Sequence, residues 1–132
     1  MITYNSRKEA KEAGFHCERE QCISVSSGAV VSIASSGRYA DITQPDGTIL
    51  LTAETGFAGR DKKIQVADQT WSERNRAFLV NLVTGAPIRV LKARKTTKRV
   101  VYDALDVLYQ VKGVEERVID GYKRIIFRLE VL

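Results

Sequence analysis

The chain has 132 residues, of which 44% are hydrophobic, enough for one domain with one sizeable core. Lys and Arg number 21 against 16 Asp and Glu, giving a formal net charge of +5, which favours a polyanionic partner over an acidic protein substrate, although a merely soluble basic protein has the same balance. No apolar run reaches the roughly 18 to 20 residues that span a bilayer, and the charged start lacks the apolar segment of a secretory signal. We therefore expect a single cytoplasmic domain over residues 1–132, with no membrane contact.

The chain opens with a helix signal. Ser6 is followed three residues later by Glu9, which is a capping-box pattern, and Gly14 supplies a stop. This spacing predicts a short surface helix over residues 6–13.

Strand signals follow over the next thirty residues. The β-branched residues of the segment 22–34 surround Ser27 and Gly28, which predicts two short strands joined by a turn. The sequence Gln-Pro-Asp-Gly at 44–47 predicts a second turn, with a strand over 48–52 on its far side.

A second helix is predicted over residues 72–83, after a loop that contains the basic segment 59–63. Gly85-Ala86-Pro87 ends the helix. The residues expected on its apolar face are Phe78, Leu79, Leu82 and Val83.

The last third reads as three strands, over 88–91, 108–112 and 122–132, with a basic loop from Lys92 to Arg99. Many short strands, two short helices and no βαβ rhythm predict an α+β domain with a curved or barrel-like sheet.

Enzymatic chemistry finds little support in the residue pattern. His16, Cys17 and Cys22 stand close together, but no second ligand pair completes a closed zinc site, so we expect no metal and reduced thiols. One histidine in the chain, no nucleophile with a base and no phosphate-cradling glycine loop predict a protein without catalysis or cofactor.

Several segments, in order along the chain, resemble the SRA (SET and RING-associated) domain family. They are NSRKEAKEAGFH (5–16), GAVVSIASSGRYAD (28–41), DGTILLTAETG (46–56), VADQTWSERNRAFLVNLVTGAPIRVLK (66–92), LDVLYQV (105–111) and DGYKRIIFRLEVL (120–132). The resemblance implies a PUA-like twisted barrel or crescent that grips duplex DNA, rotates a methylated cytosine out of the stack and encloses it. Base flipping of this kind needs a stacking surface and hydrogen-bonding groups for the base edge.

The resemblance also implies which residues form the modified-base pocket. Tyr39 falls on the family's first stacking tyrosine, although an ordinary core aromatic is the alternative. The predicted pocket comprises Ser36, Gly37, Arg38, Tyr39, Asp41, Ile42, Leu51 and Thr52. Arg38 replaces a family glycine, and its guanidinium either bonds a hydroxymethyl or sugar substituent or a phosphate, or faces solvent.

Two departures from the family pattern change what the pocket is expected to read. Ile42 stands where a second aspartate would accept from the cytosine amine. Leaving that amine without an acceptor in a closed pocket costs roughly 1 to 3 kcal/mol of binding free energy. Leu51 stands where the second stacking tyrosine sits. Three interpretations stay open: Asp41 takes over the carboxylate's work, the pocket accepts a different or bulkier modified base, or it reads no base.

The remaining DNA contacts are predicted from charge. The loop 59–63 occupies the place of the family's finger, and residues 18–21 that of an opposing thumb, which is acidic here. The cations expected to contact DNA are Arg60, Lys62 and Lys63 in that loop, and Arg89, Lys92, Arg94, Lys95, Lys98 and Arg99 further on. A solvated basic loop is the alternative for the second group.

The expected partner is double-stranded DNA that carries a modified base, with a nuclease domain or subunit supplied elsewhere, as in modification-dependent restriction. An RNA-binding PUA-like module, and an SRA-like domain whose degenerate pocket serves backbone binding or dimerisation, are the two alternatives.

Overall fold

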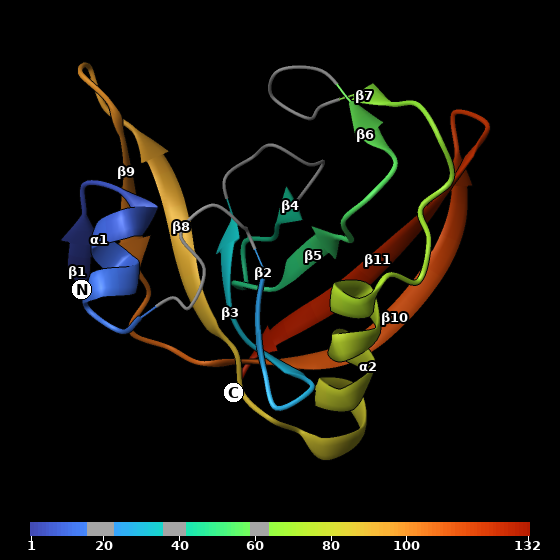
Figure 1. Ribbon diagram of the computed structural model, residues 1–132, viewed down its shortest axis with the longest axis horizontal. Helices are drawn as coiled ribbons and strands as arrows, with labels where there is room; N and C mark the ends of the chain where they lie inside the picture. The colour runs from blue at the N-terminus through green and yellow to red at the C-terminus, as the bar shows by residue number, and fades with distance from the viewer. Residues whose placement is uncertain (16–22, 36–41, 59–63) are drawn as a thin grey trace.

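The computed structural model describes residues 1–15, 23–35, 42–58 and 64–132. These ranges form two helices and eleven strands, which confirms the α+β class (Figure 1). In chain order the elements are β1 (Ile2–Tyr4), α1 (Arg7–Glu12), β2 (Ile23–Ser26), β3 (Ala29–Ser35), β4 (Ile42–Thr43), β5 (Ile49–Thr52), β6 (Phe57–Ala58), β7 (Ile64–Gln65), α2 (Glu73–Thr84), β8 (Arg89–Lys95), β9 (Val100–Ala104), β10 (Tyr109–Ile119) and β11 (Tyr122–Val131).

Both helices begin after a serine that caps them, and the cap at Ser6 was predicted from the sequence. The Ser6 hydroxyl accepts from the backbone N–H of Glu9 at 3.2 Å, and the Glu9 carboxylate accepts from the backbone N–H of Asn5 at 2.7 Å. Ser72 caps α2 in the same way, through the N–H of Asn75. Neither of these described helices is long and apolar enough to cross a membrane.

The buried residues of α2 are Asn75, Ala77, Phe78 and Asn81, so they share only Phe78 with the four predicted residues, of which Leu82 is partly buried against the core. Phe78 is fully buried, but Val83 is 85% exposed, so its predicted place on the apolar face is wrong. At about 100° per residue, Val83 lies roughly 140° around the helix from Phe78, whereas Asn81 lies only about 60° away. The core-facing position therefore belongs to Asn81, which is fully buried.

The strands form two main sheets. Sheet A has the order β1-β9-β8-β3-β2, sheet B has the order β10-β11-β5-β4, and β6 pairs with β7 in a separate small sheet. Strand β3 runs parallel to β8, with α2 in the connection between them, and the other pairs within sheets A and B are antiparallel. An isolated bridge between Ile88 and Tyr109 joins the two sheets where β8 and β10 begin.

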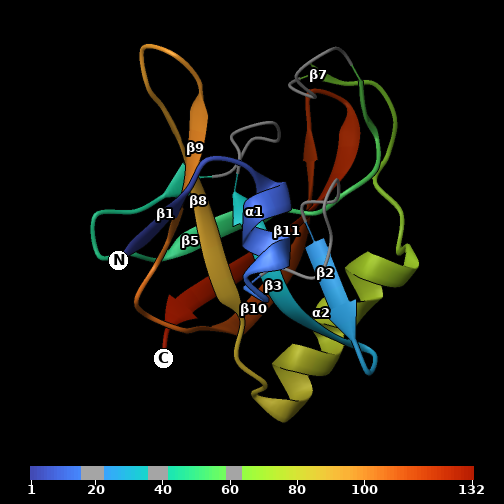
Figure 2. The ribbon, with the colours of Figure 1, turned by 60° about the vertical axis from the view of Figure 1, so that its left-hand side comes forward.

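The main core lies where the two sheets meet beneath α2. Its buried residues come from both sheets and from the helix, and Phe78 of α2 stacks on Phe127 of β11 with ring centroids 4.2 Å apart. A smaller cluster, around Leu91 and Ala104, packs α1 against the other face of sheet A. Away from the main core the sheets diverge: the β8–β9 hairpin projects on one side, and β6–β7 with the β10–β11 turn on the other (Figures 1 and 2).

Three strand predictions need correction. The segment from Lys92 to Arg99 is not a basic loop, because Lys92–Lys95 lie in β8 and residues 96–99 form the turn into β9. The predicted strand 108–112 extends to Ile119 in β10. Five strands were not predicted: β1, β4, β6 and β7 have only two or three residues, too few to show a period, and β9 follows directly on the charge run.

Candidate nucleic-acid interface

Sheets A and B both contribute to the main core, and beyond it the two sheets diverge. The alternation of side chains along β8 shows which of them lie on the core-facing side of sheet A. Val90 in β8 packs in the main core, and side chains two residues apart along a strand face the same way. Lys92 and Arg94 therefore lie on the same side of sheet A as Val90, and both are exposed. We call the part of the molecule where the two sheets diverge the open end, and sheet A presents basic side chains there.

The predicted pocket residues that the structure describes lie on two faces of sheet B. Leu51 pairs with Phe127 and is buried in the main core with 5% exposure. Ile42 pairs with Leu50, the neighbour of Leu51, so its side chain lies on the opposite face, where it is 57% exposed. The structure therefore does not bring the side chains of Ile42 and Leu51 together.

Thr52 is buried at 4% exposure and pairs with Ile126 of β11. By alternation its side chain shares the face of Leu50, not that of Leu51. The other predicted pocket residues, Ser36, Gly37, Arg38, Tyr39 and Asp41, lie outside the described residues. Their roles remain predictions.

A hollow of about 350 Å³ lies on that outer face of sheet B. Leu50, Ile126 and Val114 contribute apolar side chains to it, and Lys112 and Arg128 contribute cations. Because it does not include Leu51, this hollow is not the pocket that the resemblance implies.

The cations predicted to contact DNA divide into two groups. Arg89 donates to the carbonyl of Gly14 at 3.2 Å and lies 5.0 Å from the ring centroid of Phe15. Arg94 is bound to Asp103. The exposed side chains of Lys92, Lys95, Lys98 and Arg99 form no hydrogen bond or ion pair with the described part of the chain.

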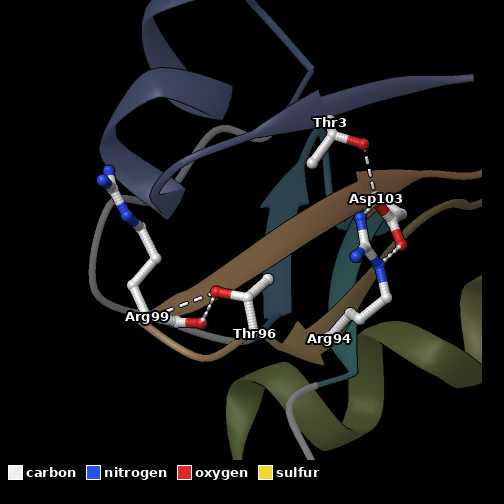
Figure 3. A network of polar contacts seen from close by, with 5 residues as sticks. All are labelled: Thr3, Arg94, Thr96, Arg99 and Asp103. Carbon is white, nitrogen blue, oxygen red and sulfur yellow. Dashed lines mark hydrogen bonds and ion pairs between the residues drawn. The ribbon is translucent and has the colours of Figure 1, made fainter.

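The contact between Arg94 and Asp103 belongs to a polar network that the sequence did not reveal (Figure 3). Asp103 Oδ2 accepts from Arg94 Nε at 2.9 Å, and Oδ1 accepts from Arg94 Nη2 at 3.2 Å and from the Thr3 hydroxyl at 2.7 Å. Hydrogen bonds from Arg94 and then Thr3 lower the pKa of Asp103 to about 2. The carboxylate is therefore ionised throughout the neutral range.

Several predicted site residues fall in segments that the structure leaves undescribed. Arg60, Lys62 and Lys63 of the finger loop lie there, as do the thumb segment 18–21 and the group of His16, Cys17 and Cys22. The predictions for these residues are untested.

Comparison with known proteins assigns the fold. The sequence profile of the SAD/SRA domain matches residues 2–132. The structure is similar to KRYPTONITE in complex with mCHH DNA, H3(1–15) peptide and SAH, with a TM-score of 0.87, 26% identity, and coverage of 99% of this chain and 31% of that one. The chain thus spans about a third of KRYPTONITE's length. A comparison with curated proteins found no match.

Two further structures extend the comparison. The SUVH5 SRA domain bound to fully hydroxymethylated CG DNA has a TM-score of 0.77 and 27% identity, over 98% of this chain and 85% of that one. The modification-dependent TagI restriction endonuclease shares the fold, with a TM-score of 0.76 and 24% identity over 97% of this chain and 47% of that one. The SRA fold predicted from the sequence is confirmed, and the chain belongs to the SAD/SRA domain family.

Proposed function

We propose that this chain binds duplex DNA and takes a modified cytosine, flipped out of the stack, into a pocket beside Leu51. The observation that carries the proposal is the SAD/SRA match over residues 2–132, together with structural similarity to SRA domains solved with methylated and hydroxymethylated DNA. The pocket's polar groups would come from the segment 36–41, as the resemblance implies.

The geometry of β4 and β5 supports a pocket with one aliphatic wall. Leu51 lies on the core face, buried at 5% exposure, and would form the aliphatic wall, while Tyr39 would supply the aromatic partner that stacks on the base. Because the Ile42 side chain lies on the other face, its missing carboxylate does not by itself rule out a cytosine reader. We propose Asp41 as the acceptor for the exocyclic amine.

We further propose that the chain acts as a binding module without catalysis of its own, and that a nuclease domain or subunit supplies cleavage. Support for the nuclease comes only from the shared fold with TagI, whose chain is about twice the length that this one covers. The base-reading step can be tested without it.

The decisive test is a titration at about physiological salt, where nonspecific contacts are weakened. Matched duplexes would carry cytosine, 5-methylcytosine, 5-hydroxymethylcytosine, glucosylated hydroxymethylcytosine or N6-methyladenine at one position. We expect about tenfold or more preference for one modified cytosine, on the scale that one satisfied base contact provides. Uniform affinity for all five duplexes would contradict a base reader, and tighter binding to an RNA of matched sequence, titrated alongside them, would favour the RNA-binding alternative.

Three variants sharpen the titration. Tyr39→Ala is expected to abolish the preference, and Asp41→Asn to reduce it for every modified cytosine. Tyr122→Ala is the matched control, because Tyr122 is 37% exposed at the start of β11 and has no proposed role in the pocket. Loss of preference in the Tyr122 control would point to a general structural effect and contradict the assignment of Tyr39.

A further inference from the structure

The β8–β9 hairpin extends beyond the cores of the protein. We call its outer part, residues 92–101, the basic arm. Leu91 is fully buried in the small core beside α1, but the next residues along β8 and the turn are exposed or half-buried. Val101 is the one buried apolar side chain of the arm, so we infer that the orientation of the arm depends mainly on its backbone pairing and on polar contacts.

The network of Thr3, Asp103 and Arg94 supplies these polar contacts at the base of the arm (Figure 3). Thr3 belongs to the edge strand β1, Asp103 to β9 and Arg94 to β8, so the network ties three adjacent strands of sheet A together. The fork of Arg94 meets both carboxylate oxygens, an arrangement that fixes direction as well as distance.

A second set of contacts fixes the turn at the tip. The backbone N–H of Thr96 donates to the carbonyl of Arg99 at 2.8 Å, and the Thr96 hydroxyl donates to the same carbonyl at 2.8 Å. The hydroxyl also accepts from the backbone N–H of Arg99 at 3.1 Å. These contacts use only the backbone of Arg99, and Figure 3 shows its side chain pointing away from Thr96.

The two arginines of the arm therefore differ in what they can still bind. Arg94 has two of its nitrogens engaged with a carboxylate that neutralises its charge. Arg99 is exposed, and its side chain forms no hydrogen bond or ion pair with the described residues. Lys95 and Lys98 are exposed in the same way, so within five residues at the tip three cations have no ion-pair partner among the described residues.

We propose that Arg94 is a positioning residue and not a DNA contact, and that with Thr3 and Asp103 it holds the basic arm so that Lys95, Lys98 and Arg99 contact the phosphate backbone of a duplex. The inference rests on the proposed function only as far as duplex binding. The inference separates cations that are neighbours in the sequence into two groups. One group contacts DNA, and the other orients the contacting side chains.

The test compares the same change at two positions, Arg94→Gln and Arg99→Gln, through the salt dependence of duplex affinity. Each phosphate contact contributes about 0.9 to the slope of log K against log salt concentration. Arg99→Gln is expected to lower the slope by about 0.9. Arg94→Gln is expected to leave the slope unchanged while weakening binding at every salt concentration, because the tip cations still reach the phosphates but the arm must then be ordered on binding. An equal loss of slope in both variants, or an unchanged slope in Arg99→Gln, would overturn the proposal.

Asp103→Asn separates positioning from simple charge. The substitution removes a negative charge and frees Arg94, so a protein that used Arg94 as a contact would bind DNA more tightly. If the network positions the arm, the variant binds more weakly despite its extra positive charge, and amide hydrogen exchange of residues 94–101 accelerates. Tighter binding with unchanged exchange would contradict the inference.

The wild-type titration distinguishes this inference from the proposed function. If the wild-type protein binds duplexes with salt dependence but shows no preference for a modified base, base reading fails and the comparison of arginines still decides the role of the arm. If the wild-type protein binds no duplex, both the proposed function and the inference fail. Circular dichroism of each variant verifies that it is folded.

Discussion

The two ends of sheet A are stabilised by different kinds of interaction. At the core end, β3 and β8 pack against sheet B and α2, with fully buried side chains such as Ile33 and Val90. At the open end, β8 and β9 continue as the basic arm, held by backbone pairing, one ion pair and a threonine turn. Hydrophobic burial stabilises the core end. Backbone pairing and polar contacts stabilise the basic arm and leave its cations exposed. Substitutions should therefore separate stability from DNA binding along a single strand pair.

The largest effect is expected in the stacked aromatic pair at the core end. Phe127→Ala removes a fully buried ring that stacks on Phe78 and meets Trp71 edge-on at 6.0 Å between centroids. The loss of burial and the cavity left behind should cost about 3 to 5 kcal/mol of unfolding free energy. Urea denaturation measures it, and a loss below about 1 kcal/mol would show that the core end is not what fixes the fold.

A second change at the core end concerns a buried amide. Asn81 accepts from the backbone N–H of Val30 at 2.8 Å and donates to the carbonyls of Val30 and Ala86 at 2.8 and 3.0 Å. Asn81→Ala leaves these groups unsatisfied between α2 and β3 and should cost about 2 to 3 kcal/mol. Val83→Ala, on the same helix but 85% exposed, is the control and should change stability by less than about 0.5 kcal/mol.

Features that depend on local contacts could be predicted from the sequence, whereas the basic arm and its polar network could not. The capped helix starts at Ser6 and Ser72 and the turn at Ser27 and Gly28 were predictable, because local hydrogen bonding and backbone conformation depend on residues close in sequence. The exposed basic arm gives no apolar alternation and looked like a loop. The partnership of Thr3 with Asp103 joins residues 100 positions apart, which no local pattern encodes.

The candidate pocket shows that a resemblance in sequence does not establish which face of a sheet a residue occupies. The resemblance to SRA domains assigns Ile42 and Leu51 to one pocket by position in the sequence. Pairing of Ile42 with Leu50 places the two side chains on opposite faces of sheet B, and only the register of β4 and β5 reveals this. The family pattern therefore predicted the fold correctly, but it did not predict which face of sheet B Ile42 and Leu51 occupy.

At the open end, a smaller and pH-dependent effect is expected. Asp103→Asn should cost about 1 to 2 kcal/mol, because it removes the charge from the hydrogen bonds with Arg94 and Thr3. The folded-state pKa of Asp103 is lowered from 3.8 to about 2, so its ionised form stabilises the protein above about pH 4 and this contribution is lost as the pH falls through about 2.

Thermal melts at pH 7, 4 and 2 measure this contribution. The gap in melting temperature between wild type and Asp103→Asn should be largest at pH 7 and should narrow at about pH 2. A gap that stays constant over this range would show that the charge of Asp103 does not stabilise the arm.

The smallest expected effect lies at the tip, where stability and binding should separate most clearly. Thr96→Val keeps the β-branched shape but removes the hydroxyl that donates to the Arg99 carbonyl and accepts from the Arg99 N–H. Because the turn is exposed, water replaces these contacts, and the loss of unfolding free energy should be only about 0.5 kcal/mol. If the turn fixes where Lys98 and Arg99 lie, duplex affinity should fall nonetheless, since ordering the tip on binding then has an entropic cost. A melt and a titration on the same variant measure the two quantities, and an affinity equal to wild type would show that the network at the base of the arm is sufficient to position its cations.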